Sequence, residues 1–211
     1  MEVKMDVYEA IRARRTIRDF NGRQVGMDAL ERIIDAGLKA PTNNHLRQWE
    51  FVIVNGKEER ANLLRVKDMT SRDECEKMLD GFGMTDEVQR NMYHEAMPRQ
   101  FSMLYNAGCL ILPFFRVREP LLQPSSLSSL NDFASIWCCI ENILIAAASE
   151  GILGVTRIPM AEESEHIKKI VGHPENYVMP CYIALGYPAE NASVPAQKRI
   201  CVKDKIHNNI W

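Results

Sequence analysis

The chain contains 211 residues, 46% of them hydrophobic, and its 26 basic and 28 acidic residues give a formal net charge of −2. This length suits one domain with a full core over residues 1–211, although two smaller domains are compatible with it. A charge so near neutrality excludes a general electrostatic field for nucleic acid or for an anionic membrane. We therefore expect neither as a partner, and any anion site must be local.

The N-terminal segment and the cysteines indicate the compartment. The first residues, MEVKMDVYEAIRARR, include no apolar stretch of the kind that a signal peptide needs, so we expect a cytoplasmic protein. The six cysteines form no CxxC pair and several lie in apolar runs, which favours buried thiols over disulfides or an iron–sulfur cluster. The histidines show no zinc-binding spacing, and we expect no metal site.

The first part of the chain predicts two helices and a strand. Asp6 followed by Glu9 is a weak capping box for a first helix, which ends in the basic run RARRTIR. Asp28 can open a second helix, and Pro41 stops it. A polar loop then leads into a strand over Trp49–Val54.

The next part, residues 57–106, is charged and helical in character. Gly81 and Pro98 divide it into pieces, and one use for such a segment is a mobile cover over a site. Cys109–Arg116 predicts a second strand, in which Pro113 indicates either an edge position or a bulge.

The most apolar run of the chain, Phe133–Ala148, has apolar residues at nearly every helical angle. We expect a helix capped at Asn131 or Asp132, with Gly151 at the C′ position. The run is too short for a membrane span and carries Glu141 inside it. A helix this apolar needs cover on both sides, from a sheet and from other helices or a partner subunit.

The last part of the chain predicts a helix, a strand and an arm. Ala161–Val171 has the pattern of a short surface helix, and Val178–Leu185 that of a strand. The tail Ala189–Trp211 has little periodicity but carries several large apolar residues. We expect this tail to lie on an apolar surface.

Three polar regions are candidates for binding. Arg14–Arg18 offers guanidinium groups that suit phosphate, but it equally suits a solvated helix end. The loop Ala40–Trp49 places amides, an imidazole and a cation before a strand, where ligand contacts and ordinary turns are both common. The glycines of Glu150–Gly154 would let backbone amides approach a planar ligand, and a helix C-cap explains the first of them as well.

In combination these regions resemble the nitroreductase family of FMN-dependent oxidoreductases. The matching pieces are RRTIRDF, APTNNHLRQWEFVIV, ENILIAAASEGILGVTRIP, IALGYP and the terminal QKRICVKDKIHNNIW. They occur in the order and spacing of the family across almost the whole chain, and only residues 57–101 match poorly.

The resemblance implies a flavin site assembled from distant pieces. The implied FMN-binding residues outside the loop are Arg14, Arg15, Thr16, Arg18, Gly151, Ile152, Leu153, Gly154, Lys198 and Arg199. Residues 14–16 match the segment that holds the phosphate and ribityl chain, and Arg18 matches a basic position near the pyrimidine edge. Residues 151–154 match backbone that passes near the reactive N5 atom. Lys198 and Arg199 match a basic pair that completes the phosphate site.

The polar loop is implied to reach the FMN of the other subunit. Its matching residues are Pro41, Thr42, Asn43 and His45. His45 stands where the family often has Asn. Arg47 and Gln48 stand where the family often has Gln and Pro. A positive charge from either Arg18 or Arg47 near N1 and O2 of the ring would stabilise the reduced flavin.

The resemblance also implies the fold and the activity. It implies an α+β fold with a central mixed sheet flanked by helices, in an intertwined homodimer whose C-terminal arm, residues 189–211, wraps around the partner. The implied reaction moves hydride from NADH or NADPH through FMN to a nitroaromatic, quinone or similar small acceptor, with no catalytic side chain because flavin N5 carries the chemistry. The alternatives are a specialised flavin enzyme that dehalogenates or cleaves flavin, and a non-catalytic flavin-binding or storage protein.

Overall fold

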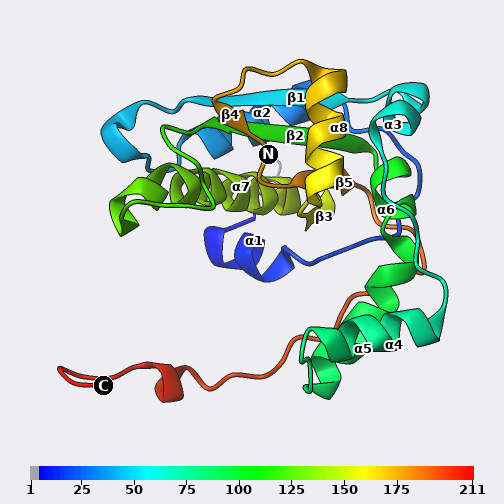
Figure 1. Cartoon of the computed structure of the whole chain (residues 1–211). Helices are drawn as coiled ribbons and strands as arrows, with labels where there is room; N and C mark the ends of the chain where they lie inside the picture. The colour runs from blue at the N-terminus through cyan, green and yellow to red at the C-terminus, as the bar shows by residue number, and fades with distance from the viewer. Residues whose placement is uncertain (1–4) are drawn as a thin grey trace.

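A computed structural model describes residues 5–211, so Met1–Lys4 of the segment in which we found no signal peptide lie outside the described residues. The described residues form a five-stranded sheet in the order β1-β2-β5-β3, with β4 also paired to β2 (Figure 1). The strands are β1 (Trp49–Val54), β2 (Cys109–Arg116), β3 (Leu153–Arg157), β4 (Tyr177–Val178) and β5 (Tyr182–Gly186). All these pairs are antiparallel, and the parallel component of the predicted mixed sheet is the bridge between Thr16 and Gly154.

The helices surround this sheet. They are α1 (Val7–Ala13), α2 (Met27–Leu38), α3 (Lys57–Leu63), α4 (Arg72–Gly81), α5 (Glu87–Ala96), α6 (Ser102–Tyr105), α7 (Asn131–Ser149) and α8 (Ala161–Val171), with the 3-10 turns η1 (Asn43–His45), η2 (Met97–Arg99), η3 (Leu127–Leu130) and η4 (Val202–Lys205). The predicted bounds of β1, β2 and α8 are confirmed.

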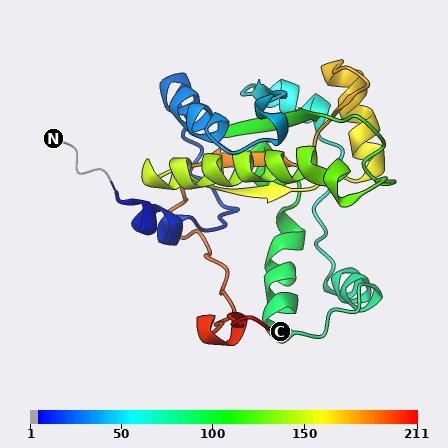
Figure 2. The same ribbon diagram turned by 90° about the vertical axis from the view of Figure 1, so that its left-hand side faces the viewer.

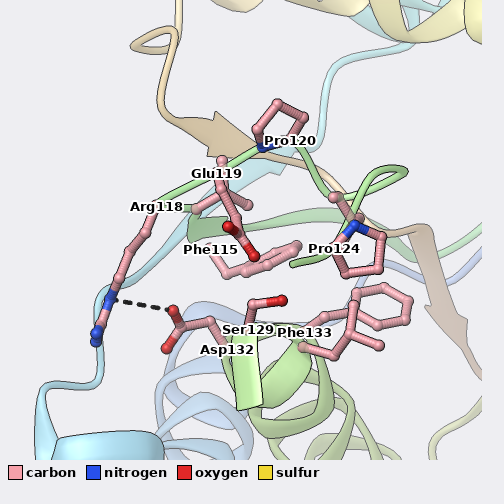
Figure 3. Close-up of a pocket in the computed structure, with 11 residues that line it drawn as sticks. Phe115, Arg118, Glu119, Pro120, Pro124, Ser129, Asp132 and Phe133 are labelled. Carbon is pink, nitrogen blue, oxygen red and sulfur yellow. Dashed lines mark ion pairs between the residues drawn. The ribbon is translucent and has the colours of Figure 1, made fainter. Parts of the chain in front are cut away.

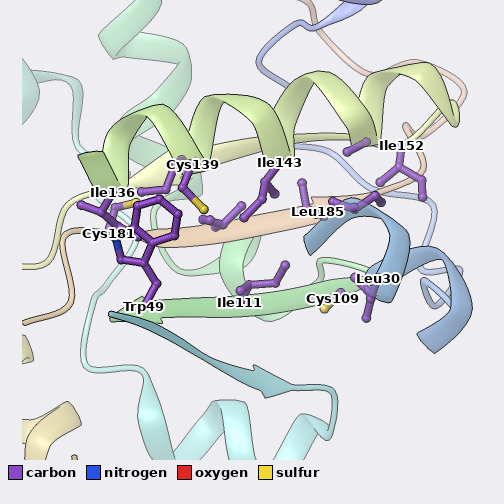
Figure 4. Packing of buried hydrophobic residues seen from close by; sticks show 14 of the residues in the cluster. Leu30, Trp49, Cys109, Ile111, Ile136, Cys139, Ile143, Ile152, Cys181 and Leu185 are labelled. Carbon is purple, nitrogen blue, oxygen red and sulfur yellow. The ribbon is translucent and has the colours of Figure 1, made fainter. Parts of the chain in front are cut away.

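Alternation along the strands divides the core into two clusters. Residues such as Ile111 and Ile183 face α2 and α7. Figure 4 shows this cluster, with Trp49, Ile111 and Leu185 of the strands below α7. Their neighbours, such as Leu110 and Ala184, pack on α3, α6 and α8. Successive side chains of a strand point to opposite faces, so a continuous apolar run such as β2 needs cover on both.

Pro113 lies in the interior strand β2 rather than at an edge, opposite Phe51 of β1. The register on the other side of β2 shifts by one residue between the pairs Phe115↔Val178 and Ile111↔Ile183. This shift is a bulge that separates β4 from β5, and Pro113 falls opposite it. The edge alternative is wrong, and the extra residue lies not in β2 but between β4 and β5. That segment contains Pro180, so the predicted single strand Val178–Leu185 is interrupted where neither Pro180 nor Pro113 has an N–H for the ladder.

The central helix begins earlier than predicted. η3 precedes α7 directly, and Ser126 and Ser129 form the capping box, so neither Asn131 nor Asp132 is the N-cap. Among the described residues, η3 and α7 together are long and apolar enough to cross a membrane. Six residues of α7 are nevertheless buried in the protein, which is typical of a core helix. Gly151 follows the C-cap with φ 72°, as predicted.

One face of α7 stays open. Ala134, Cys138 and Glu141, at helical spacings of four and three residues, are exposed. The prediction that Cys138 is buried is wrong for this reason, whereas burial raises the pKa of Cys139, on the covered face, to about 12.

The other helix starts give one success and one error. Asp6 and Glu9 form the predicted capping box of α1. α2, however, begins after Gly26, which makes no side-chain cap, and Asp28 lies inside its first turn. An acidic residue there still favours the positive end of the helix dipole, which explains the misleading signal.

Residues 57–106 are helical, as predicted, and α4 and α5 project from the sheet (Figures 1 and 2). The C-terminal tail leaves the body alongside α5 and extends beyond it. Its large apolar residues are exposed, from 47% for Val194 to 101% for Trp211. The apolar surface that we predicted under the tail is therefore not supplied by residues 5–211 of the same chain.

Candidate functional site

The basic run lies directly beside the glycine segment. Thr16 pairs with Gly154 in the parallel bridge, and the Ile17 N–H donates to the Gly154 carbonyl at 3.1 Å. Ile17 is 1% exposed, so its side chain anchors the run in the protein. The structure thus brings residues 14–18 and 151–154 together at the C-terminal end of α7.

Arg14, Arg15 and Arg18 of this run have different surroundings. Arg14 Nε lies 3.4 Å from Glu141 Oε1, and Arg15 Nη2 donates to the Pro195 carbonyl at 2.5 Å. Arg18 Nε is buried and has no hydrogen-bond partner among the described residues. Burial lowers the pKa of Arg18, and the carboxylate of Glu95 opposes that shift. An orphaned buried donor in a basic run fits an anionic ligand.

Gly151 and Gly154 are required for different physical reasons. A Cβ on Gly154 would lie 2.2 Å from the Ala184 carbonyl oxygen, so the close approach of β5 requires this glycine. A Cβ on Gly151 would meet nothing within 4 Å, and its positive φ alone favours glycine. Ile152 is 1% exposed and packs in the core, so only its backbone can face a ligand. Leu153 is partly buried.

The polar loop lies at the other end of α7. The Asn43 N–H donates to Ser135 Oγ near the start of the helix, and Arg47 Nε donates to the Leu38 carbonyl. His45 and Arg47 have φ of 56° and 44°, a left-handed backbone that non-glycine residues adopt at a cost. Ser135, which holds the loop, precedes Gly151 by 16 residues along α7 and its C-terminal cap, a separation of roughly 24 Å.

The loop contains two further predicted residues and lines one cavity of about 10 Å³, which shares Phe115 and Asp132 with a second cavity. Thr42 Oγ1 donates to the Asn43 carbonyl, and Pro41 is exposed. The second cavity, also of about 10 Å³ and enough for about one water, opens near the start of α7. Figure 3 shows Arg118 and Asp132 of its lining paired, at 3.4 Å. This cavity is far too small for a flavin.

The predicted basic pair of the tail does not join Arg14. Lys198 Nζ lies 2.5 Å from Asp86 Oδ2, at the N-cap of α5, and Arg199 is exposed. Pro195, through Arg15, connects the tail with the basic run, and the Ala189 N–H donates to the Asp19 carbonyl directly after that run.

The sequence reasoning missed two cations near Arg18. Lys57 lines a cleft with Arg18, and Arg60 is completely buried next to it. Arg60 shares a helical face with Leu63 and Leu64, at spacings of three and four residues, and this spacing was the available signal that Arg60 points inward.

Known proteins are similar to this chain over most of its length. Residues 11–187 match the nitroreductase family. A predicted NADH dehydrogenase/NAD(P)H nitroreductase of Methanothermobacter thermautotrophicus is 27% identical over 99% of this chain and 89% of its own length. An iodotyrosine deiodinase of Haliscomenobacter hydrossis is 25% identical over 95% of this chain and 86% of its own.

A solved structure shares the fold. Oxidised iodotyrosine deiodinase, bound to FMN and 3-iodo-L-tyrosine, superposes with a TM-score of 0.70 at 18% identity, covering 98% of this chain and all of that one. The family match covers most of the chain, and the sheet with its flanking helices agrees with it. The chain belongs to the nitroreductase family.

Proposed function

We propose that this protein binds FMN between two copies of the chain and moves electrons from NADH or NADPH to a small acceptor such as a nitroaromatic or a quinone. The observation that carries this proposal is the placement of the predicted site residues at opposite ends of α7. One chain alone cannot bring Asn43 and Gly154 to the same ligand, whereas two chains related by a twofold axis can.

The open face of α7 supports such a pairing. A twofold axis across the middle of the helix sets two copies antiparallel, so that the exposed stripe of Ala134, Cys138 and Glu141 is covered by its own copy. The loop of one protomer then approaches the basic run of the other. The exposed apolar tail, which ends at Trp211, supplies further surface for the partner.

The residues at the C-terminal end of α7 fit a phosphorylated flavin. Arg14 and Arg15 provide guanidinium groups for a phosphate, and the buried Nε of Arg18 lacks a partner that a ring oxygen would supply. The backbone at Gly151 faces open space, which leaves room for a planar ring. Each of these features suits FMN without any further side-chain chemistry.

FMN, when bound, supplies the hydride and electron transfer, and the protein tunes it. Arg18 and the partner's Arg47 place positive charge where negative charge accumulates on reduction of the ring. The partner's loop 41–47 would exclude water from the same face.

Anaerobic stopped-flow spectroscopy tests the proposal. The purified protein should be yellow, release FMN on denaturation, and be bleached by NADH or NADPH and recoloured by a quinone. Failure of both nicotinamides to bleach the bound flavin would reject the nicotinamide half. A flavin that no donor reduces would instead indicate a storage protein.

Reductive dehalogenation is a second candidate, because a deiodinase relative matches 95% of this chain. In that reaction a C–I bond becomes C–H, two electrons and a proton are consumed, and iodide leaves. Iodide release from 3-iodotyrosine with dithionite as the reductant, measured beside quinone turnover, separates the two. We expect quinone turnover to exceed iodide release, and the opposite ratio would favour dehalogenation.

A further inference from the structure

A cleft of about 300 Å³ opens between the chain after the basic run and the helices α3 and α6. Its polar lining consists of two cations, Arg18 and Lys57, and of amide and hydroxyl groups that can both donate and accept, those of Asn21, Gln24, Ser102 and Asn106. Its carboxylate, Asp19, already accepts a hydrogen bond from Arg99 Nε at 3.0 Å. The cleft therefore carries an excess of positive charge.

Lys57 contributes a cation that is matched only by neutral groups. Its Nζ donates to the Tyr105 carbonyl at 2.7 Å and to Asn106 Oδ1 at 3.1 Å, and it lies 4.2 Å from the centre of the Tyr105 ring. Among the described residues no carboxylate forms an ion pair with it. Burial, and then the charge of Arg60, lower the pKa of Lys57.

Arg60 adds a second cation behind Lys57. It is 0% exposed and donates only to backbone carbonyls, those of Val54, Tyr105 and Ala107. Its Nη2 has no partner among the described residues. A buried guanidinium without a carboxylate is costly, and a bound anion nearby would offset that cost.

We propose that this cleft binds a phosphate group. Two lining cations, Arg18 and Lys57, with amide and hydroxyl groups around them, are the chemistry that recognises phosphate oxygens. Arg60 does not line the cleft and adds only its charge behind Lys57. The cleft adjoins the proposed flavin site, because Arg18 belongs to both, whereas Lys57, Ser102 and Asn106 line the cleft alone. The phosphate belongs either to the free ion or to a phosphorylated adenosine moiety such as that of NADPH.

Calorimetric titration of the purified dimer with inorganic phosphate, at constant ionic strength, tests this inference. Wild-type protein shows saturable binding. Lys57→Met weakens it about tenfold, the order expected for one charge-assisted contact. Asn106→Asp keeps an acceptor for Lys57 Nζ but adds a negative charge, and it weakens binding similarly. Lys77→Met, at an exposed lysine of α4, leaves binding at the wild-type level.

The inference is overturned if wild-type protein does not bind phosphate saturably, or if both cleft variants bind it as wild type does. It is also overturned if Lys57→Met loses its FMN, because the cleft would then be part of the flavin site. Competition by adenosine 2′-phosphate but not adenosine identifies the dinucleotide as the source, and its absence identifies the free ion. Because the titration does not depend on flavin turnover, failure of the proposed reaction leaves this test intact.

Discussion

The two ends of α7 are built in different ways. At the C-terminal end the basic run is tied to β3 by backbone contacts between Thr16, Ile17 and Gly154. At the N-terminal end the loop is held through Ser135 Oγ and passes through a left-handed residue at His45. The sheet fixes the first end. At the second end the left-handed backbone of the loop is strained, at a cost of about 1–2 kcal/mol for each left-handed residue.

This difference suggests a division of labour. The end that belongs to the sheet presents cations in a fixed place, and the strained end presents a loop to a ligand held elsewhere. Neither end is a complete site in one chain. The following predictions test the difference, from the largest expected effect to the smallest.

Gly154→Ala should destabilise the protein by about 3 kcal/mol, because the new Cβ would meet the Ala184 carbonyl oxygen at 2.2 Å. Gly151→Ala is the matched control: it has open space around it and only a positive φ to tolerate, so we expect about 1 kcal/mol. Urea denaturation measures both. Equal losses would show that the approach of β5 does not fix this end.

Arg14→Ala should weaken FMN binding by about 1.5–3 kcal/mol, the range for a hydrogen bond to a charged group. Arg12→Ala, on the exposed side of the same helix, is the control. Fluorescence titration of the stripped protein with FMN gives both affinities. An unchanged affinity in the Arg14 variant would return the basic run to an ordinary solvated helix end.

Deletion of Trp211 should weaken the dimer by about 2 kcal/mol if the indole is buried against the partner. The side chain is 101% exposed in one chain, where it stacks on His207 at 4.8 Å between ring centres. Sedimentation equilibrium measures the change. A dimer of unaltered strength would mean that this end of the tail is ordinary surface.

The contact between the tail and α5 should be sensitive to acid, with the smallest effect of the four. The hydrogen bond from Lys198 lowers the pKa of Asp86 below its ordinary value of 3.8. The contact is therefore intact above that value and is lost as the pH falls below it through the lowered pKa. Limited proteolysis of the tail across this range should show the change.

Asp86→Asn is the matched variant for that experiment. Asparagine still caps α5, because it is as good an N-cap as aspartate, but it has no charge for Lys198. The tail of this variant should be cleaved at one rate at every pH in the range. A persistent pH dependence would assign the effect to another group.

Local patterns were sufficient to predict most elements of the fold. β1 and β2 are continuous apolar runs, and Ala161–Val171 is amphipathic, so each pattern by itself indicates the element and where it ends. The start of α7 was wrong because the capping box of Ser126 and Ser129 added a turn that its composition did not suggest. Pro113 was predicted only as far as two alternatives, since the choice depends on which strand lies beside it.

The candidate site was harder to predict, because its contacts join distant parts of the chain. Nothing near Thr16 indicates that it pairs with Gly154, which is set by the place of β3 at the sheet edge. Lys198 was expected beside the basic run but pairs with Asp86, the N-cap residue of α5, because the tail passes that end of the helix. The grouping of the site residues came from the family resemblance rather than from any local signal.

A subunit-mixing experiment tests the shared site most directly. One variant carries Arg14→Glu and Arg15→Glu at the sheet end. The other carries His45→Asp and Arg47→Asp at the loop end, where aspartate tolerates a left-handed backbone. Each variant alone should bind little FMN.

Both variants are unfolded together, refolded as mixed dimers and titrated with FMN. If each site takes one end of α7 from each chain, half of the dimers are mixed and one of their two sites is intact, so about a quarter of the wild-type FMN capacity should return. If each chain holds its flavin alone, mixing restores nothing, and that result would contradict the account.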